Sequence, residues 1–165
     1  MNTARVPIRY HARPPDQHGD TQLALVTFEL DHQHYGLPLN IVRQVVRVPA
    51  LLLLAGAPSY VCGMLNLHGS HIPVLSGRAL VDAPVVCDLN NQIIIVGRAN
   101  ERGDNVPICG LLVDHVYDVY YYESQHITPL NNYVASALLQ GVIQGREHPI
   151  LLFNADALLA LVPSQ

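Results

Sequence analysis

The sequence contains no lysine, so all nine of its basic residues are arginine. A chain without lysine cannot form a Schiff base with a substrate, and it lacks the lysine of a nucleotide-binding P-loop. Charge is scarce altogether, because only 13% of the residues are charged and the formal net charge is −4. The scattered arginines form no basic stripe, which argues against nucleic acid as a partner.

Cysteine is also scarce, with only Cys62, Cys87 and Cys109 in the chain. Two of them lie in apolar, strand-like runs directly before a glycine. We therefore expect buried, reduced thiols and a cytoplasmic protein. No cysteine has the polar, electropositive surroundings of an activated nucleophile, and no serine lies in a GxSxG sequence.

Long hydrophobic runs are missing as well. The most apolar window, Val48 to Pro58, is too short to cross a bilayer, so we expect no membrane insertion. This window is either a buried connector or an apolar surface that a partner covers. Residues 1–20 contain three arginines and three prolines and fit neither a signal peptide nor a membrane span. They are predicted to form a mobile N-terminal tail, followed by one domain at residues 21–165.

Alternation of apolar and polar residues is the main pattern that the sequence does contain. It predicts a half-buried strand from Leu23 to Leu30. Further strands are predicted at residues 35–39, 45–48, 92–98, 106–113, 138–143 and 149–153, with a glycine-led hairpin at residues 63–75. Asn40 and Asp114 are predicted to cap single helical turns, and Asn154 to cap a C-terminal helix. We expect an all-β fold, mostly β with short helices.

The two halves of the chain resemble each other. When Gly36 is placed on Gly110, a shift of 74, GLPLNIVRQVV falls on GLLVDHVYDVY without a gap. Further on, CGMLN at Cys62 falls on QGVIQ at Gln140, a shift of 78. The pattern indicates one small β unit used twice, which suits a small closed barrel that hides its strand edges. Chance similarity between short apolar strings is the alternative.

Close pairs of histidines raise the alternative of a metal-dependent enzyme. The pairs are His32 with His34 and His68 with His71. All four fall on predicted hairpin turns, and no HExxH or CxxC sequence accompanies them. Asp114 and Asp118 are four residues apart, but a cap and a solvated strand residue explain them better than an acid–base pair. We expect no catalysis, no cofactor and no metal.

Several strings match a known family in order and spacing. They are YGLPLNIVRQVVRV, PSYVCGMLNLHGSHIPVL, ICGLLVDHVYDV, LLQGVI and PILLFNADALL. Together they resemble the CheW-like domain of bacterial chemotaxis coupling proteins. The resemblance implies two five-stranded SH3-like β-barrels packed on a shared core. It also implies a non-enzymatic signalling adaptor that couples the signalling tip of a methyl-accepting chemoreceptor to the regulatory domain of a CheA-type histidine kinase, in chemotaxis or in type IV pilus-type motility.

The same resemblance implies a set of partner-binding residues, at or beside a groove between the two barrels that takes receptor tips. Carried over by motif, they are Val42, Gln44, Gly63, Asn66 and His68. The chain departs from the family where Gln44 replaces a common glutamate and His68 a common arginine. Imidazole cannot copy the bidentate fork of arginine, so partner binding is expected to change. A divergent CheW-like module that has lost receptor coupling and serves another assembly is therefore the second hypothesis.

Overall fold

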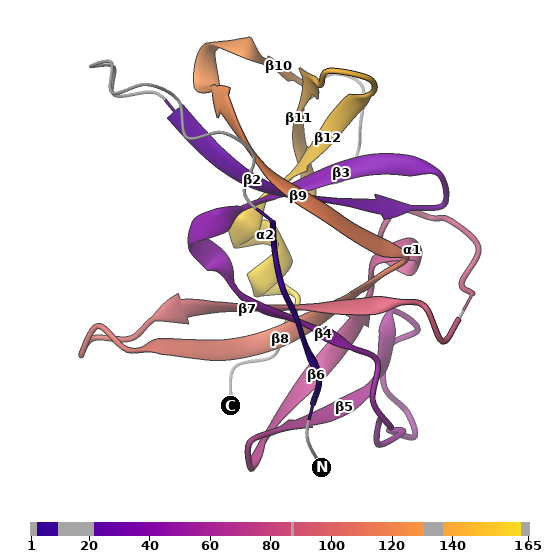
Figure 1. The fold of residues 1–165 in the computed structure, drawn as a ribbon. Helices are drawn as coiled ribbons and strands as arrows, with labels where there is room; N and C mark the ends of the chain where they lie inside the picture. The colour runs from indigo at the N-terminus through magenta and orange to yellow at the C-terminus, as the bar shows by residue number, and fades with distance from the viewer. Residues whose placement is uncertain (1–2, 10–21, 87, 131–136, 163–165) are drawn as a thin grey trace.

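The computed structural model describes residues 3–9, 22–86, 88–130 and 137–162. Two six-stranded sheets lie one above the other, with the C-terminal helix between them (Figure 1). The strands are β1 (Arg5–Val6), β2 (Gln22–Leu30), β3 (Gln33–Pro38), β4 (Val42–Arg47), β5 (Val61–Leu67), β6 (Ser70–Ser76), β7 (Gln92–Ala99), β8 (Asn105–Val113), β9 (His115–Glu123), β10 (Ile127–Pro129), β11 (Leu139–Gln144) and β12 (Pro149–Phe153). The helices are α1 (Gly77–Leu80) and α2 (Ala155–Ala160), with 3-10 turns at Leu39–Ile41 and Ser124–His126. Within these ranges no helix is long and apolar enough to span a membrane.

The two sheets have matching strand orders. Sheet A runs β1-β4-β7-β8-β6-β5, and sheet B runs β10-β11-β12-β3-β2-β9. Without the short strands β1 and β10, each sheet contains five strands. In each sheet one parallel pair, β6 with β8 or β12 with β3, joins antiparallel hairpins. The mostly β architecture is therefore the predicted one, and its strand order is compatible with two five-stranded barrels.

The strand registers repeat with the offsets that the sequence predicts. Val74 pairs with Gly110 in sheet A, and Leu152 pairs with Gly36 in sheet B, which reproduces the shifts of 78 and 74. The halves also exchange a hairpin each: β7 and β8 of the second half lie between β4 and β6 of the first, and β2 and β3 of the first half lie between β9 and β12 of the second. β4 of the first half pairs with β7 of the second, and β9 of the second half pairs with β2 of the first. Each sheet is consequently built from both halves of the chain.

The largest buried cluster draws residues from both sheets and contains Phe28, Phe153, Val96 and Leu111. The rings of Phe28, Tyr35 and Phe153 lie 5.5–5.9 Å apart, within the range of favourable aromatic packing. Two smaller clusters lie within single sheets, one in sheet A and one in sheet B. This central cluster is the shared core that the family resemblance implies.

Two of the three predicted caps are wrong. The turn at Leu39–Ile41 has Pro38 at its N-cap position, so Asn40 lies inside the turn. Asp114 is followed directly by β9, and its carboxylate accepts hydrogen bonds from Arg78 instead of capping a helical turn. Asn40 and Asp114 instead lie shortly before the strands β4 and β9, and neither caps a helix. Asn154 does cap α2, because its side-chain oxygen accepts a hydrogen bond from the Ala157 N–H at 3.1 Å.

Part of the predicted N-terminal tail forms a short strand. Arg5 and Val6 form β1, which pairs antiparallel with Val46 and Val45 of β4. Val6 also packs against the shared core, which explains why this stretch is held. Residues 1–2 and 10–20 of the predicted tail lie outside the described residues, as does Cys87. Of the other two cysteines, Cys109 is buried and Cys62 is partly buried.

Candidate partner-binding surface

β4 carries two of the predicted partner-binding residues. Val42 is 9% exposed and belongs to the shared core, so it supports the surface from beneath. Gln44 is half-buried, and its side-chain oxygen accepts a hydrogen bond from Arg5 Nε at 3.0 Å. A glutamate at this position would form an ion pair with Arg5 instead. The N-terminal strand β1 thus contributes to the surroundings of Gln44.

The turn between β5 and β6 carries two more of these residues. Asn66 shapes the turn, because its side-chain oxygen accepts a hydrogen bond from the Gly69 N–H at 2.9 Å. His68 is exposed at the tip of the turn and has a positive φ of 52°. In the described part of the chain, no hydrogen bond or ion pair joins His68 to Gln44, whose contact is with Arg5. The two departures from the family pattern therefore act separately.

Gly63 lets another segment cross close to β5. Its φ is +149°, and a Cβ atom added there would lie 2.6 Å from the Leu52 carbonyl oxygen. Leu52 and Met64 exchange two backbone hydrogen bonds, of 2.9 and 2.8 Å, across this approach. Only glycine accommodates both the conformation and the distance. Gly63 is itself buried, so it acts through the segment that it seats.

The seated segment is an exposed apolar surface. Leu52, Leu53 and Leu54 are 62%, 80% and 44% exposed, and we call these three residues the leucine edge. Leu51 packs against the small core of sheet A and fixes the start of the segment. Of the two sequence interpretations, the structure supports an offered surface over a buried connector. Three adjacent exposed leucines are typical of a surface that a partner covers.

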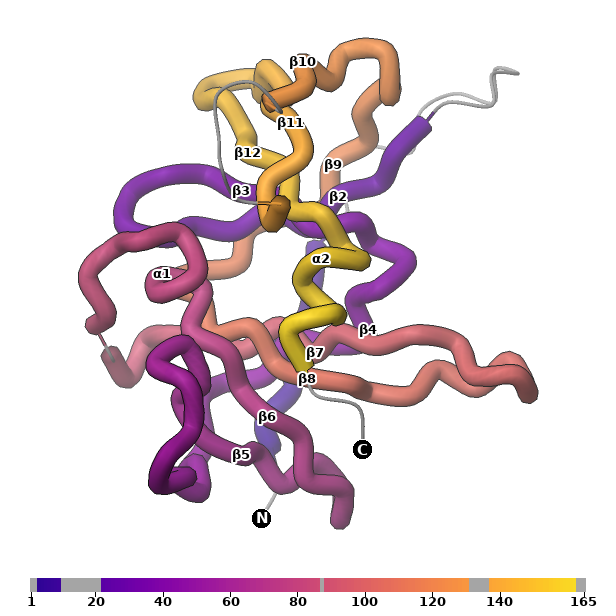
Figure 2. Tube along the Cα trace, turned by 180° about the vertical axis from the view of Figure 1, so that it is seen from behind, coloured from indigo at the N-terminus to yellow at the C-terminus, as the bar shows by residue number. Residues whose placement is uncertain are grey.

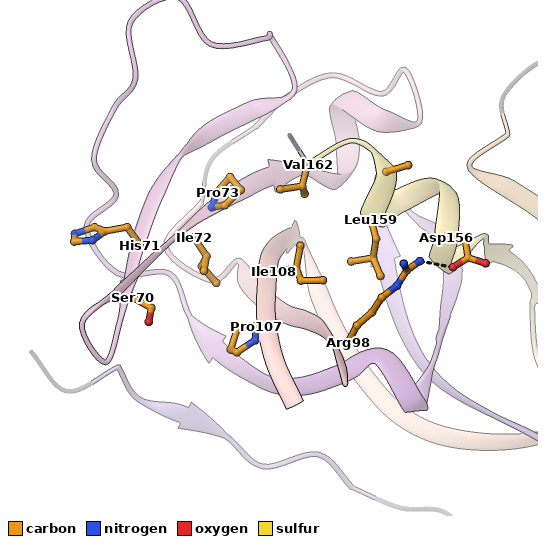
Figure 3. Close-up of a pocket in the computed structure, with 11 residues that line it drawn as sticks. Ser70, His71, Ile72, Pro73, Arg98, Pro107, Ile108, Asp156, Leu159 and Val162 are labelled. Carbon is orange, nitrogen blue, oxygen red and sulfur yellow. Dashed lines mark hydrogen bonds and ion pairs between the residues drawn. The ribbon is translucent and has the colours of Figure 1, made fainter. Parts of the chain in front are cut away.

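A groove of about 720 Å³ lies where α2 meets sheet A. Its lining comes from β6, the β7–β8 hairpin and the C-terminal helix, which lies beside β7 and β8 in Figure 2. Apolar side chains face the groove, namely Ile72, Pro73, Pro107, Ile108, Leu159 and Val162 (Figure 3). At one side Arg98 forms an ion pair with Asp156 of α2. An apolar floor with a charged rim suits a protein segment better than a small polar substrate.

None of the five residues transferred from the family lines this groove. The neighbouring Ser70 and His71 do, at its edge. Sequence patterns could not identify the groove residues, because these come from four separated stretches of chain that only the fold brings together. The string PSYVCGMLNLHGSHIPVL was the signal nearest to them, since it contains the groove residues Ile72 and Pro73.

A charged cluster that the sequence did not predict joins the two halves. Arg78 of α1 donates to Asp114 from Nε at 2.8 Å and from Nη2 at 2.7 Å, and Nη1 contacts Asp31 at 3.3 Å. The hydrogen bond with Asp114, followed by the negative charges around it, raises the pKa of Arg78. The separations of 36 and 47 residues hide these contacts from sequence patterns. The cluster fixes the β2–β3 turn against α1.

The described residues contain no group of three histidine, cysteine, aspartate or glutamate side chains placed to hold a metal ion. The thiol of Cys109 is unsuited to nucleophilic chemistry, because burial raises its pKa to about 12. The hydroxyl of Ser76 accepts a hydrogen bond from the Ala79 N–H at 3.2 Å and so caps α1. For binding a protein segment, the geometry offers the apolar groove and the leucine edge.

Comparison with known proteins gives consistent matches. A family model described as CheW-like domain matches residues 24–162. A chemotaxis protein CheW of Treponema pallidum is 36% identical over 70 residues, covering 42% of this chain and 41% of that protein. A chemotaxis protein CheW of Klebsiella aerogenes is 24% identical over 136 residues, covering 81% of this chain and 79% of that protein.

A solved structure shows the same fold. It is the scaffolding protein TtCheW from Thermoanaerobacter tengcongensis, with a TM-score of 0.69 and 24% identity. The match covers 80% of this chain and 88% of that chain. At this identity the likeness shows the fold alone.

Proposed function

The chain belongs to the family of CheW-like domains, whose model matches residues 24–162, and from this premise we propose that it is a non-enzymatic signalling adaptor. In this proposal it couples the signalling tip of a chemoreceptor to the regulatory domain of a CheA-type histidine kinase through protein contacts. The pathway is chemotaxis or type IV pilus-type motility, and the site of action is the cytoplasm. No cofactor takes part.

One observation carries the proposal, namely that the chain offers two separate apolar surfaces. The groove beside α2 is lined by β6, β7, β8 and the helix. The leucine edge lies along β5 at the border of sheet A. A coupling protein needs two partners at once, and two distinct surfaces meet that need.

We assign one partner to each surface. The groove has a floor of aliphatic side chains and the Arg98–Asp156 pair at its rim, which suits the apolar face of a receptor helix. The leucine edge suits the kinase domain, because an exposed segment already paired to β5 can extend a partner's sheet or cover an apolar patch. Gln44 and His68 tune these contacts, while Val42, Gly63 and Asn66 support them.

The test is a binding experiment with purified kinase regulatory domain and a receptor tip fragment. Leu53→Ser removes an 80%-exposed side chain from the leucine edge. It should weaken kinase binding by about tenfold and leave receptor binding unchanged. Leu89→Ser is the matched control, because Leu89 is 98% exposed and lies outside both surfaces. Binding of neither partner by the unchanged chain would reject the adaptor function.

Receptor binding distinguishes the divergent-module hypothesis. Ile108→Asp places a charge on the floor of the groove, where Ile108 is half-buried. Under the proposed function it abolishes receptor binding and keeps kinase binding. A chain that binds kinase but no receptor fragment, with or without Ile108→Asp, is instead the module that has lost receptor coupling.

A further inference from the structure

The small cores of the two sheets can be compared position by position, because the halves repeat. Leu25, Ile143 and Leu152 form the buried cluster of sheet B. Their counterparts in sheet A are Ile93, Leu65 and Val74, and all three belong to the buried cluster there. That cluster in sheet A contains eight buried residues, against three in sheet B. The buried core of sheet B is therefore the smaller of the two.

Two replacements between the halves contribute to this difference. The pairs Thr27–Gly36 and Ile95–Gly110 align Thr27 of sheet B with Ile95 of sheet A. The shift of 78 aligns Gly145 with Leu67, and the turn contacts agree, since Gly145 bonds His148 as Leu67 pairs with Ser70. Two aliphatic side chains of the sheet A core are thus a threonine and a glycine in sheet B.

A hollow of about 520 Å³ opens at this end of sheet B. Thr27 and Gly145 line it together with Glu29, His34, Tyr117, Asp118, Tyr120, Tyr122, Arg146, Glu147, His148 and Ile150. The hollow lies on sheet B, away from the residues of the groove and of the leucine edge, which contact sheet A. It is consequently a separate site, and its existence does not depend on the proposed function.

Aromatic rings form one side of the hollow. The imidazole rings of His34 and His148 stack at 4.6 Å with an angle of 11° between their planes. His34 also stacks on Tyr117 at 5.3 Å, and the rings of Tyr120 and Tyr122 lie 6.2 Å apart. Ring faces attract cations, and the planar guanidinium group of arginine is the cation that stacks on them most often.

A half-buried carboxylate lies in the same hollow. The side chain of Glu29 is only 22% exposed, and Tyr117 Oη donates a hydrogen bond to it at 2.5 Å. His32 Nδ1 lies 3.8 Å from this carboxylate, and the His32 side chain is 93% exposed. The charge of Arg78 also acts on Glu29. A carboxylate withdrawn from water gains most from a cation that approaches it directly. Carboxylates also outnumber the guanidinium of Arg146 in the lining.

We propose that this hollow binds the guanidinium group of an arginine side chain that a partner protein presents. Glu29 accepts two hydrogen bonds from the planar fork, and the ring of Tyr117, which is hydrogen-bonded to Glu29, contacts its face. A lysine ammonium lacks both the fork and the plane, so it binds more weakly. Arg146 and Glu147, from the turn between β11 and β12, form the charged rim of the hollow.

The experiment follows backbone amide NMR signals of the full chain during titration with N-acetyl-arginine N-methylamide. The citrulline and lysine analogues serve as comparison probes, because citrulline keeps the shape of arginine without its charge. We expect saturable shifts at β2, β9 and the β11–β12 turn with the arginine probe. The lysine probe should bind several-fold more weakly, and the citrulline probe should cause no shifts at these elements.

Two variants locate the binding. Glu29→Gln keeps an acceptor for Tyr117 and removes the charge, so it should weaken the arginine probe by about tenfold or more. Thr27→Ile introduces the residue that sheet A has at this position and should fill the hollow. Glu101→Gln removes an exposed carboxylate outside the hollow and should leave binding unchanged.

Three results would each overturn the proposal. They are equal shifts with citrulline, equal affinity for lysine and arginine, and unchanged affinity in Glu29→Gln. Thermal unfolding of each variant checks the fold, and Glu29→Gln remains informative if Thr27→Ile loses stability with the hydrogen bond from its hydroxyl to the Asp118 carbonyl. Loss of kinase or receptor binding has no bearing on these outcomes, so this site and the adaptor function can fail independently.

Discussion

Among single side chains, Arg78 makes the densest set of polar contacts between distant parts of the chain. Its side chain is 17% exposed and that of Asp114 is 16% exposed. Asp114 also accepts a hydrogen bond from the Asp31 N–H at 2.8 Å. Removing one member of such a cluster leaves the other charge with too little water around it, which costs more than the pair itself contributes.

We therefore expect Asp114→Ala to lower the free energy of unfolding by about 2–4 kcal/mol in urea denaturation. The double variant Arg78→Met, Asp114→Leu should lose less free energy of unfolding than the two single variants together, because it leaves neither charge without its partner. Arg98→Ala is the control: its pair with Asp156 is exposed at 53% and 88%, and an exposed pair contributes about 0–1 kcal/mol. If the losses of the two single variants simply add in the double variant, Arg78 and Asp114 do not stabilise the fold as a pair.

Tyr117 predicts a specific loss of stability in alkaline solution. Burial, followed by the hydrogen bond to Glu29 and its negative charge, raises the pKa of Tyr117 from 10.0 to about 12. The folded chain thus holds this proton more tightly than the unfolded chain. The contribution is complete below the unfolded pKa of 10.0 and is lost as the pH rises toward 12.

Urea denaturation of the chain and of Tyr117→Phe between about pH 8 and about pH 11 measures this effect. The unchanged chain should lose more free energy of unfolding over this interval than the variant, which has no phenol at this position to titrate. Tyr122 and Cys109, whose pKa values are also raised to about 12, titrate in both proteins and cancel. Parallel curves would show that burial of the Tyr117 phenol does not affect stability.

Strands and turns show where sequence patterns suffice. The hairpins were predictable because apolar runs of strand length are separated by polar turns. The burial of β2 was not, because residues 25–28 are all buried where alternation predicted a half-buried strand, and β8 is buried in the same continuous way. β1 and β10 were not predictable, because two- and three-residue strands exist only through their pairing with β4 and β11. Asn40 and Asp114 misled for a related reason, since a short polar residue before an apolar run is typical of a helix cap and of a strand entry alike.

The leucine edge depends on Gly63, and a pair of glycine variants tests this. Gly63→Ala combines an unfavourable φ of +149° with a Cβ atom 2.6 Å from the Leu52 oxygen. Gly69→Ala is the control, because its φ is +90° but a Cβ atom meets nothing within 4 Å. We expect Gly69→Ala to lose about 1 kcal/mol and Gly63→Ala to lose more.

Hydrogen exchange distinguishes backbone strain at the glycine from displacement of the leucine edge in these variants. Protection of the Leu52 and Met64 amides, which bond each other's carbonyls, should be lost in Gly63→Ala and kept in Gly69→Ala. Protected amides in Gly63→Ala would mean that β5 shifts instead of the leucine edge. If the leucine edge binds the kinase as proposed, the same displacement predicts that Gly63→Asp abolishes this binding without removing a direct contact.

In the molecule as a whole, each sheet combines strands from both halves, which the sequence repeat does not indicate. The sequence alone shows the offsets of 74 and 78, and the strand registers reproduce them. The exchange of the β2–β3 and β7–β8 hairpins between the halves was not visible, because a repeat predicts which units are alike and gives no information on which copies pair. The family resemblance gave the two-barrel architecture, but none of its five partner-binding residues lines the groove. A groove built from separated stretches is a property of the folded chain.

Strand exchange predicts that neither half folds alone. A break after Leu89, which is 98% exposed, separates β4 from β7 and β9 from β2, the partners in the exchanged pairs. The fragments 1–89 and 90–165 should each lack cooperative urea unfolding and a dispersed amide NMR spectrum. Mixed in equal amounts they should regain both, with a midpoint that rises with concentration because association is now bimolecular. Cooperative unfolding of either fragment alone would show that half of the repeat is an independent barrel, and that the exchanged strands are dispensable to it.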